Sequence, residues 1–330
     1  TQRRIGTAHD TCLRESEVIA TSIEALESAV AAGVCRRRPD GSVYIPVRST
    51  GEADLTLLRR DGTSLVFSML LGVYLTRAAL YPGWQVMELT GEQWRAGRTA
   101  MYEVLTRIGR EDLSATTEGV FFGMVQLGGR VMRSRSGTVV TADELLDRTA
   151  ERVRGWEACP ESLRDDAAAR DRLGTALLKY HVLRYPRADG FSFDEEWMWT
   201  EATARLGAVL RTRTWAQTEG GPLDHPDGDR PEVRSLLLTL ARHGASAGRS
   251  LARRDPAILV RYVDDVVAKA QVAARRGPVP PRARTAVGHV VDRSLALLGI
   301  DLEGPVGLLP EGRGARPGDG RRRQPATTGH

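Results

Sequence analysis

The pattern of apolar residues changes near residue 155, and this change constrains the fold more than any other feature of the sequence. Before it, short strand-like runs such as 42–47 alternate with helical patterns. The run 84–89 lies between two helical patterns, an order typical of a parallel sheet. After residue 160 there is almost no strand signal. Helical spacing instead covers residues 162–184, 195–217, 232–251, 256–276 and 281–298. The sequence therefore predicts an α/β fold followed by an all-α helical bundle.

Turn residues set further boundaries in the first half. Asp61-Gly62-Thr63 lies between the apolar runs 55–59 and 64–68, which predicts a hairpin. The apolar run 119–127 predicts another strand, and the pattern over 142–153 predicts a helix.

Three regions follow from these patterns. Residues 1–155 form the α/β part, residues 160–305 the helical part, and residues 310–330 a tail rich in glycine, proline and arginine. Because such a composition cannot bury a core, we expect the tail to be disordered. Its five arginines and two acids supply +3 of the net charge of +5. This basic balance is compatible with a nucleic-acid partner.

The composition excludes several other classes of protein. Hydrophobic residues make up 41% of the chain and charged residues 27%, as in globular proteins. No window approaches the roughly 20 apolar residues of a membrane span, and the first residues lead into no signal segment, so we expect a cytoplasmic protein without a membrane partner. Cys12, Cys35 and Cys159 are far apart and form no Cys-x-x-Cys, which predicts buried or incidental thiols and no metal site.

Several segments of both parts, taken in order, resemble arginyl-tRNA synthetases. In the α/β part they are residues 10–16, 59–65, 91–93, 122–125, 134–140 and 143–147. In the helical part they are residues 178–183 with 193–194, residues 255–263 and residues 297–300. The sequence Ser-Arg-Ser-Gly-Thr-Val-Val at 134–140 is the most specific, because it resembles this family's form of the class I signature loop.

The resemblance implies the second half of a Rossmann-like class I catalytic domain in residues 1–155 and a DALR-type anticodon-binding domain in residues 160–305. It implies an arginine–tRNA ligase that binds tRNA and uses ATP, with Mg²⁺ as the counterion of ATP. Its catalysis would consist of positioning and of stabilising phosphate charge. The residues implicated are Arg130, Arg133, Ser134 and Arg135 in catalysis, Ser136, Gly137 and Gln93 in cofactor binding, and Arg261, Lys269 and Arg293 in tRNA binding.

Three departures from the family pattern concern the catalytic half. No His-x-Gly-His signature occurs in the 330 residues, so we expect that an upstream domain or a separate N-terminal subunit carries it or that it is lost. Val131 or arginines stand where the signature loop has lysines. Val66 and Leu70 occupy the positions at which the family reads arginine with a Tyr and an Asp. A guanidinium buried there without an acceptor would be strongly disfavoured.

A fourth departure lies in the helical part, where Leu206, Val209 and Leu210 stand at positions that carry aromatic residues in the family. Base stacking by this segment is therefore not expected. Three functions stay open. The first is an arginine–tRNA ligase, and the second is a degenerate paralogue that binds tRNA without aminoacylation, serving a partner enzyme or regulation. The third is an altered synthetase that charges another amino acid together with a separate N-terminal subunit.

Overall fold

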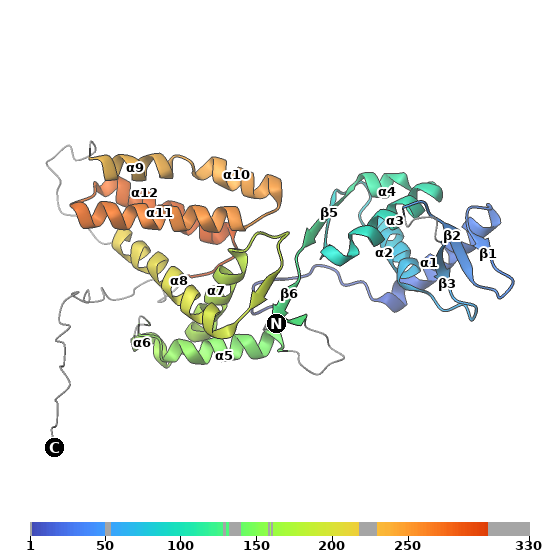
Figure 1. Ribbon diagram of the computed structural model, residues 1–330, viewed down its shortest axis with the longest axis horizontal. Helices are drawn as coiled ribbons and strands as arrows, with labels where there is room; N and C mark the ends of the chain where they lie inside the picture. The colour runs from blue at the N-terminus through green and yellow to red at the C-terminus, as the bar shows by residue number, and fades with distance from the viewer. Residues whose placement is uncertain are drawn as a thin grey trace, which may run out of the picture.

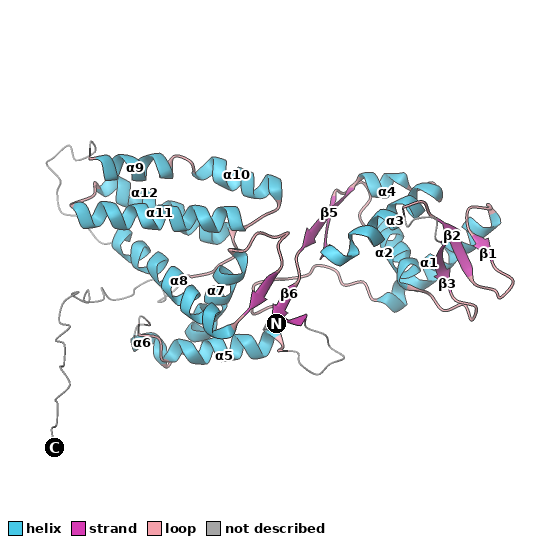
Figure 2. Ribbon diagram, in the orientation of Figure 1, coloured by secondary structure: helices cyan, strands magenta, loops and turns pink. Residues whose placement is uncertain are grey.

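The computed structural model describes residues 2–49, 54–127, 130–131, 140–157, 159, 161–217 and 230–302. An α/β part precedes a part built almost entirely of helices, as the sequence predicts (Figures 1 and 2). The predicted tail at 310–330 lies outside the described residues. Among the described helices, none is both long and apolar enough to cross a membrane.

The α/β part contains two small sheets with helices packed around them. Its helices are α1 (Glu15–Ala31), α2 (Val66–Leu80), α3 (Arg95–Arg107) and α4 (Glu111–Ala115). Its strands are β1 (Arg36–Arg37), β2 (Val43–Pro46), β3 (Asp54–Leu58), β4 (Val86–Gly91) and β5 (Thr117–Phe122). The order β1-β2-β3 is antiparallel, whereas β4 and β5 pair in parallel from Val86↔Thr117 to Gly91↔Phe122. The parallel sheet predicted from the run 84–89 is confirmed, whereas the run 42–47 lies in the antiparallel sheet.

The predicted hairpin around Asp61 is wrong in its second arm. Leu58 and Ser64 form a single antiparallel bridge, and the chain then enters α2 at Val66. The turn itself forms because the Asp61 carboxylate accepts the backbone N–H of Thr63 over 2.9 Å. The second arm becomes helical because α2 buries apolar side chains such as Leu71 in the same core as those of α1. This packing outweighs the local strand pattern.

The predicted strand over 119–127 is divided into two. β5 ends at Phe122, and β6 (Val125–Leu127) begins after Gly123 and Met124. Gly123 donates its N–H to the carbonyl of Arg187 over 2.9 Å. A Cβ on Gly123 would lie 2.2 Å from the carbonyl carbon and oxygen of Asp189, so only glycine allows this approach. The contact ties the end of β5 to the helical part.

In the helical part, the structure corrects one sequence prediction and changes the bounds of two predicted helices. A three-residue strand, β8 (Phe191–Phe193), pairs in parallel with β6, although the sequence shows almost no strand signal there. Helix α5 (Ala142–Arg154), which the sequence places in the α/β part, packs against α7 (Ala167–Leu183) and is described with the helical part. The remaining helices are α6 (Glu161–Arg164), α8 (Glu195–Gln217), α9 (Pro231–Leu240), α10 (His243–Arg253), α11 (Ala257–Arg276) and α12 (Pro281–Leu297). The predicted helix 162–184 is divided because the Asp166 side chain caps α7, and 232–251 is divided between α9 and α10.

Side chains from α7, α8, α9, α11 and α12 form the core of this part. Leu206, Val209 and Leu210 are fully buried in it, so the face of α8 that carries them is core. A polar network crosses the same core. Tyr180 donates to Asp264 over 2.7 Å, and Arg205 reaches the other oxygen of that carboxylate over 2.8 Å. The network joins α7, α8 and α11 through hydrogen bonds and so favours a single packing of the three helices.

Candidate functional site

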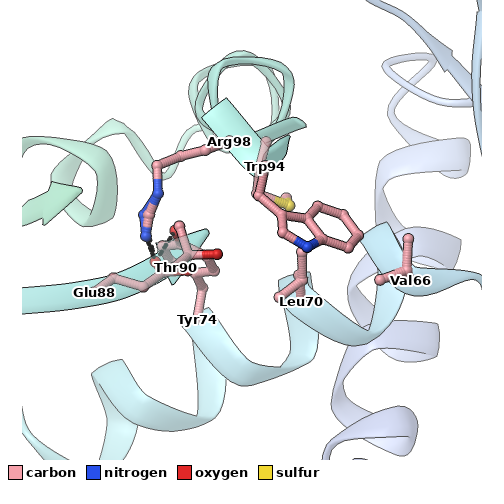
Figure 3. Close-up of a pocket in the computed structure, with 8 residues that line it drawn as sticks. Val66, Leu70, Tyr74, Glu88, Thr90, Trp94 and Arg98 are labelled. Atoms are coloured by element: carbon pink, nitrogen blue, oxygen red, sulfur yellow. Dashed lines mark hydrogen bonds and ion pairs between the residues drawn. The ribbon is translucent and has the colours of Figure 1, made fainter. Parts of the chain in front are cut away.

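A cavity of about 240 Å³ lies between α2, β4 and α3 (Figure 3). Eight residues line it: Val66, Leu70, Tyr74, Glu88, Thr90, Trp94, Arg98 and Met101. The periodicity of each element explains this set. On α2 the lining residues recur every four positions, which places them on one helix face, and on β4 they recur every two, which places them on one strand face. These elements hold the lining in place, together with the 3-10 turn Glu92–Trp94 between β4 and α3, which supplies Trp94.

One side of the cavity is apolar. Trp94 lies over Leu70, with Val66 beyond it (Figure 3). Val66 is 38% exposed and Trp94 39% exposed, whereas Met101 is buried. The indole N–H of Trp94 is the single side-chain hydrogen-bonding group among these four residues. We call Val66, Leu70, Trp94 and Met101 the apolar wall.

The other side of the cavity holds a buried ion pair. Arg98 donates from Nη1 to Oε2 of Glu88 over 2.7 Å, and the hydroxyl of Tyr74 donates to the same oxygen over 2.6 Å. The Arg98 side chain is only 5% exposed. Burial raises the pKa of Tyr74 to about 12, so its hydroxyl keeps the proton that it donates. The charge of Glu88 is therefore already balanced by Arg98.

The predicted tRNA-binding residues are spread over two helices of the helical part. Arg261 and Lys269 lie on α11, about 12 Å apart along its axis. Arg293, on α12, lies close enough to His243 for its charge to help burial lower the pKa of that histidine. Arg261 donates from Nε to the carbonyl of Ala257 over 3.1 Å. None of the three basic side chains forms an ion pair within the part of the chain that the structure describes.

The comparisons with known proteins point in one direction. No family model matches the chain. Arginine–tRNA ligase of Treponema denticola is 28% identical over 286 residues, which are 80% of this chain and 47% of that protein. The ligase of Treponema pallidum subsp. pallidum is 26% identical over 280 residues, 80% of this chain and 47% of that protein. The chain is a distant homologue of arginyl-tRNA synthetases. It spans about half the length of the curated relatives it matches.

Solved structures of arginyl-tRNA synthetases show the same fold. The Thermus thermophilus enzyme gives a TM-score of 0.69 at 15% identity, covering 90% of this chain and 60% of that one. The Plasmodium falciparum enzyme gives 0.70 at 12% identity, covering 91% of this chain and 54% of that one. The α/β fold followed by helices is therefore that of part of an arginyl-tRNA synthetase.

The structure brings together two of the positions at which this homologue departs from the family pattern. Val66 and Leu70 both contribute to the apolar wall of one cavity. Gln93 is exposed in the turn after β4 and is not among the residues that line the cavity. Its side chain folds back over Gly91, where an added Cβ would lie 2.3 Å from its Oε1 atom.

The signature loop of this synthetase homologue lies almost wholly beyond what the structure describes. The backbone of Arg130 belongs to β7 (Arg130–Val131), which pairs antiparallel with β6. The other loop residues named above, Arg133, Ser134, Arg135, Ser136 and Gly137, lie outside the described residues. The structure places none of the six side chains.

Two features of this homologue were missed by sequence reasoning. The ion pair of Arg98 and Glu88 has no local signal, because its residues belong to no shared motif. The second feature is the set of basic side chains on α10, and here the sequence does hold a signal, because residues 243–253 contain no acid. Ser246 is the single fully buried residue of this helix, and Arg249 and Arg253 are exposed. Neither arginine is ion-paired with any acid that the structure describes.

Proposed function

We propose that this arginyl-tRNA synthetase homologue binds tRNA and takes part in ATP-dependent formation of aminoacyl-tRNA. Residues 1–155 would supply the second half of the catalytic domain, and residues 160–305 the anticodon-binding domain. The observation that carries the proposal is homology running in order through both parts, over 80% of the chain. Charging of tRNA takes place in the cytoplasm, where we place the protein.

tRNA would lie against basic side chains of α10, α11 and α12. Arg261, Arg293 and the half-buried Lys269 are the predicted contacts, and the exposed Arg249 and Arg253 on α10 add further positive charge. Free of acidic partners among the described residues, these groups can displace counterions from phosphates. We therefore propose that backbone contacts, and not base stacking by α8, supply the affinity.

Filter binding of unfractionated tRNA at several salt concentrations tests this proposal. Binding should weaken steeply with salt, and Arg249→Gln/Arg253→Gln/Arg293→Gln should lower the log–log slope by about 2–3. Arg36→Gln, an exposed change on β1, is the matched control and should leave the slope unchanged. A chain ending at residue 310 measures what the tail contributes. No binding at low salt would refute the proposal.

ATP with Mg²⁺ would bind at the signature loop, where one or two of its arginines, Arg130 and Arg133, would reach phosphate and Arg135 would brace the loop. Ser134, Ser136 and Gly137 would offer hydrogen bonds. Gln93 is proposed to assist from the turn after β4. An upstream domain or separate subunit would carry the His-x-Gly-His signature. Calorimetry with ATP tests the loop: Arg133→Ala should lose about tenfold or more in nucleotide affinity, because one charge-assisted contact is removed. tRNA binding should not change.

A second candidate function is tRNA binding without aminoacylation. The observation that favours it is the apolar wall, since Val66 and Leu70 offer no acid to a guanidinium and Glu88 is already paired. Pyrophosphate exchange separates the candidates. With the upstream part present, pyrophosphate exchange that depends on any one amino acid supports the ligase. Absence of exchange with all twenty amino acids supports the binding protein. For the chain alone with arginine, we expect no exchange.

A further inference from the structure

We propose that the cavity between α2, β4 and α3 binds the uncharged, apolar side chain of an amino acid and excludes the guanidinium of arginine. This inference rests on the proposed function, because it assigns the cavity to an amino-acid substrate. It names the class of that substrate as aliphatic or aromatic.

The size of the cavity limits its occupant. Its volume of about 240 Å³ falls below the ~300–1,000 Å³ of sites that enclose drug-sized ligands. A nucleotide is too large for such a space, whereas a single amino-acid side chain is of the right order. α2 and α3 share a core of buried residues, including Leu71 and Met101, and β4 is held by its pairing with β5, so the cavity is largely preformed.

The apolar wall selects for an apolar group. Val66 and Trp94 remain more than a third exposed, and an occupant would remove this apolar surface from water. Leu70 and Met101 complete a surface that offers neither acid nor amide. Trp94 presents its ring, which packs against aliphatic or aromatic groups alike. An apolar side chain therefore gains contact without losing hydrogen bonds to water.

The polar side of the cavity opposes a second cation. Glu88 is the single acid among the described residues that line the cavity, and its charge is balanced by the buried guanidinium of Arg98. A bound arginine would bring a second guanidinium beside Arg98, with one carboxylate for two positive charges. Tyr74 cannot supply the missing charge, because its hydroxyl keeps its proton and donates to Glu88. Like charges at short range in a partly buried site are strongly disfavoured.

Saturation-transfer NMR on the 330-residue chain, with each amino acid at equal concentration, tests the inference. We expect saturation transfer to the methyl or ring protons of at least one of leucine, isoleucine, valine, methionine and phenylalanine, and none to arginine. Titration then gives the affinity of the strongest ligand. Transfer to arginine as strong as to the apolar ligands, or to no amino acid at all, overturns the inference.

A variant locates the binding. Leu70→Asp places a carboxylate in the apolar wall and should weaken the apolar ligand about tenfold or more. Leu80→Asp is the matched control, because Leu80 lies on the same helix, is 51% exposed and lines no part of the cavity. If Leu70→Asp does not fold, Val66→Glu replaces it, since Val66 is 38% exposed and begins α2, where an acid is favourable. Unchanged affinity in a folded variant overturns the inference.

The tRNA titration described above, made on the same preparation, separates this inference from the proposed function. A chain that binds tRNA and no amino acid refutes the assignment of the cavity alone. A chain that binds an apolar amino acid and no tRNA refutes the proposed function and leaves the assignment of the cavity intact.

Discussion

Arg98 donates from Nη1 to Oε2 of Glu88 over 2.7 Å, and this ion pair joins α3 to β4 beside the cavity. The two side chains are 5% and 26% exposed. Arg98 also reaches the hydroxyl of Tyr102 over 3.4 Å, and that hydroxyl donates to the carbonyl of Thr117 on β5. The pair therefore links a helix to both strands of the parallel sheet.

Glu88→Gln should lower the free energy of unfolding by about 3–5 kcal/mol, because it leaves the buried guanidinium of Arg98 without a counter-charge. Urea unfolding at pH 7 gives this number. Glu92→Gln is the matched control, since it breaks the Glu92–Arg95 pair, whose side chains are 44% and 57% exposed. Its effect should be much smaller. Equal shifts for the two variants would contradict this account of the ion pair.

His181 should make stability depend on pH. Burial lowers its pKa to about 4, and the side chain is 2% exposed on α7. The unfolded chain, with a pKa near 6.5, binds this proton first, so the stabilising contribution is complete above about pH 6.5 and is lost as pH falls towards 4. The loss for this group is about 3 kcal/mol.

His181→Phe removes the titrating group and keeps a ring for Phe193 and Tyr185 to contact. Unfolding free energies between pH 7 and 4.5 should then fall less steeply than in the wild type. His9→Gln changes an exposed histidine and serves as the control, with a wild-type slope. Parallel curves for wild type and His181→Phe would show that His181 does not carry the effect.

Two glycine substitutions should change stability in opposite directions. Gly123→Ala brings a Cβ within 2.2 Å of the Asp189 carbonyl, so the turn that ends beside β8 must move away. We expect a loss of about 1–3 kcal/mol. Gly248→Ala on α10 meets nothing within 4 Å and should raise stability by about 0.5–1 kcal/mol through helix propensity. Thermal unfolding of both variants checks the signs, and a neutral Gly123→Ala would refute the close approach.

The sequence by itself determined the elements whose signal is local. Apolar periodicity over 195–217 predicts a helix at the bounds of α8. The place of the run 84–89 between helical patterns predicts a parallel sheet, which β4 forms with β5. Tertiary structure alone decided that Val66 begins a helix and that β8 pairs with β6, about 66 residues away. It also decided which side chains surround the cavity. Strand pairing, burial and charge balance depend on residues distant in the chain, and no local pattern records those partners.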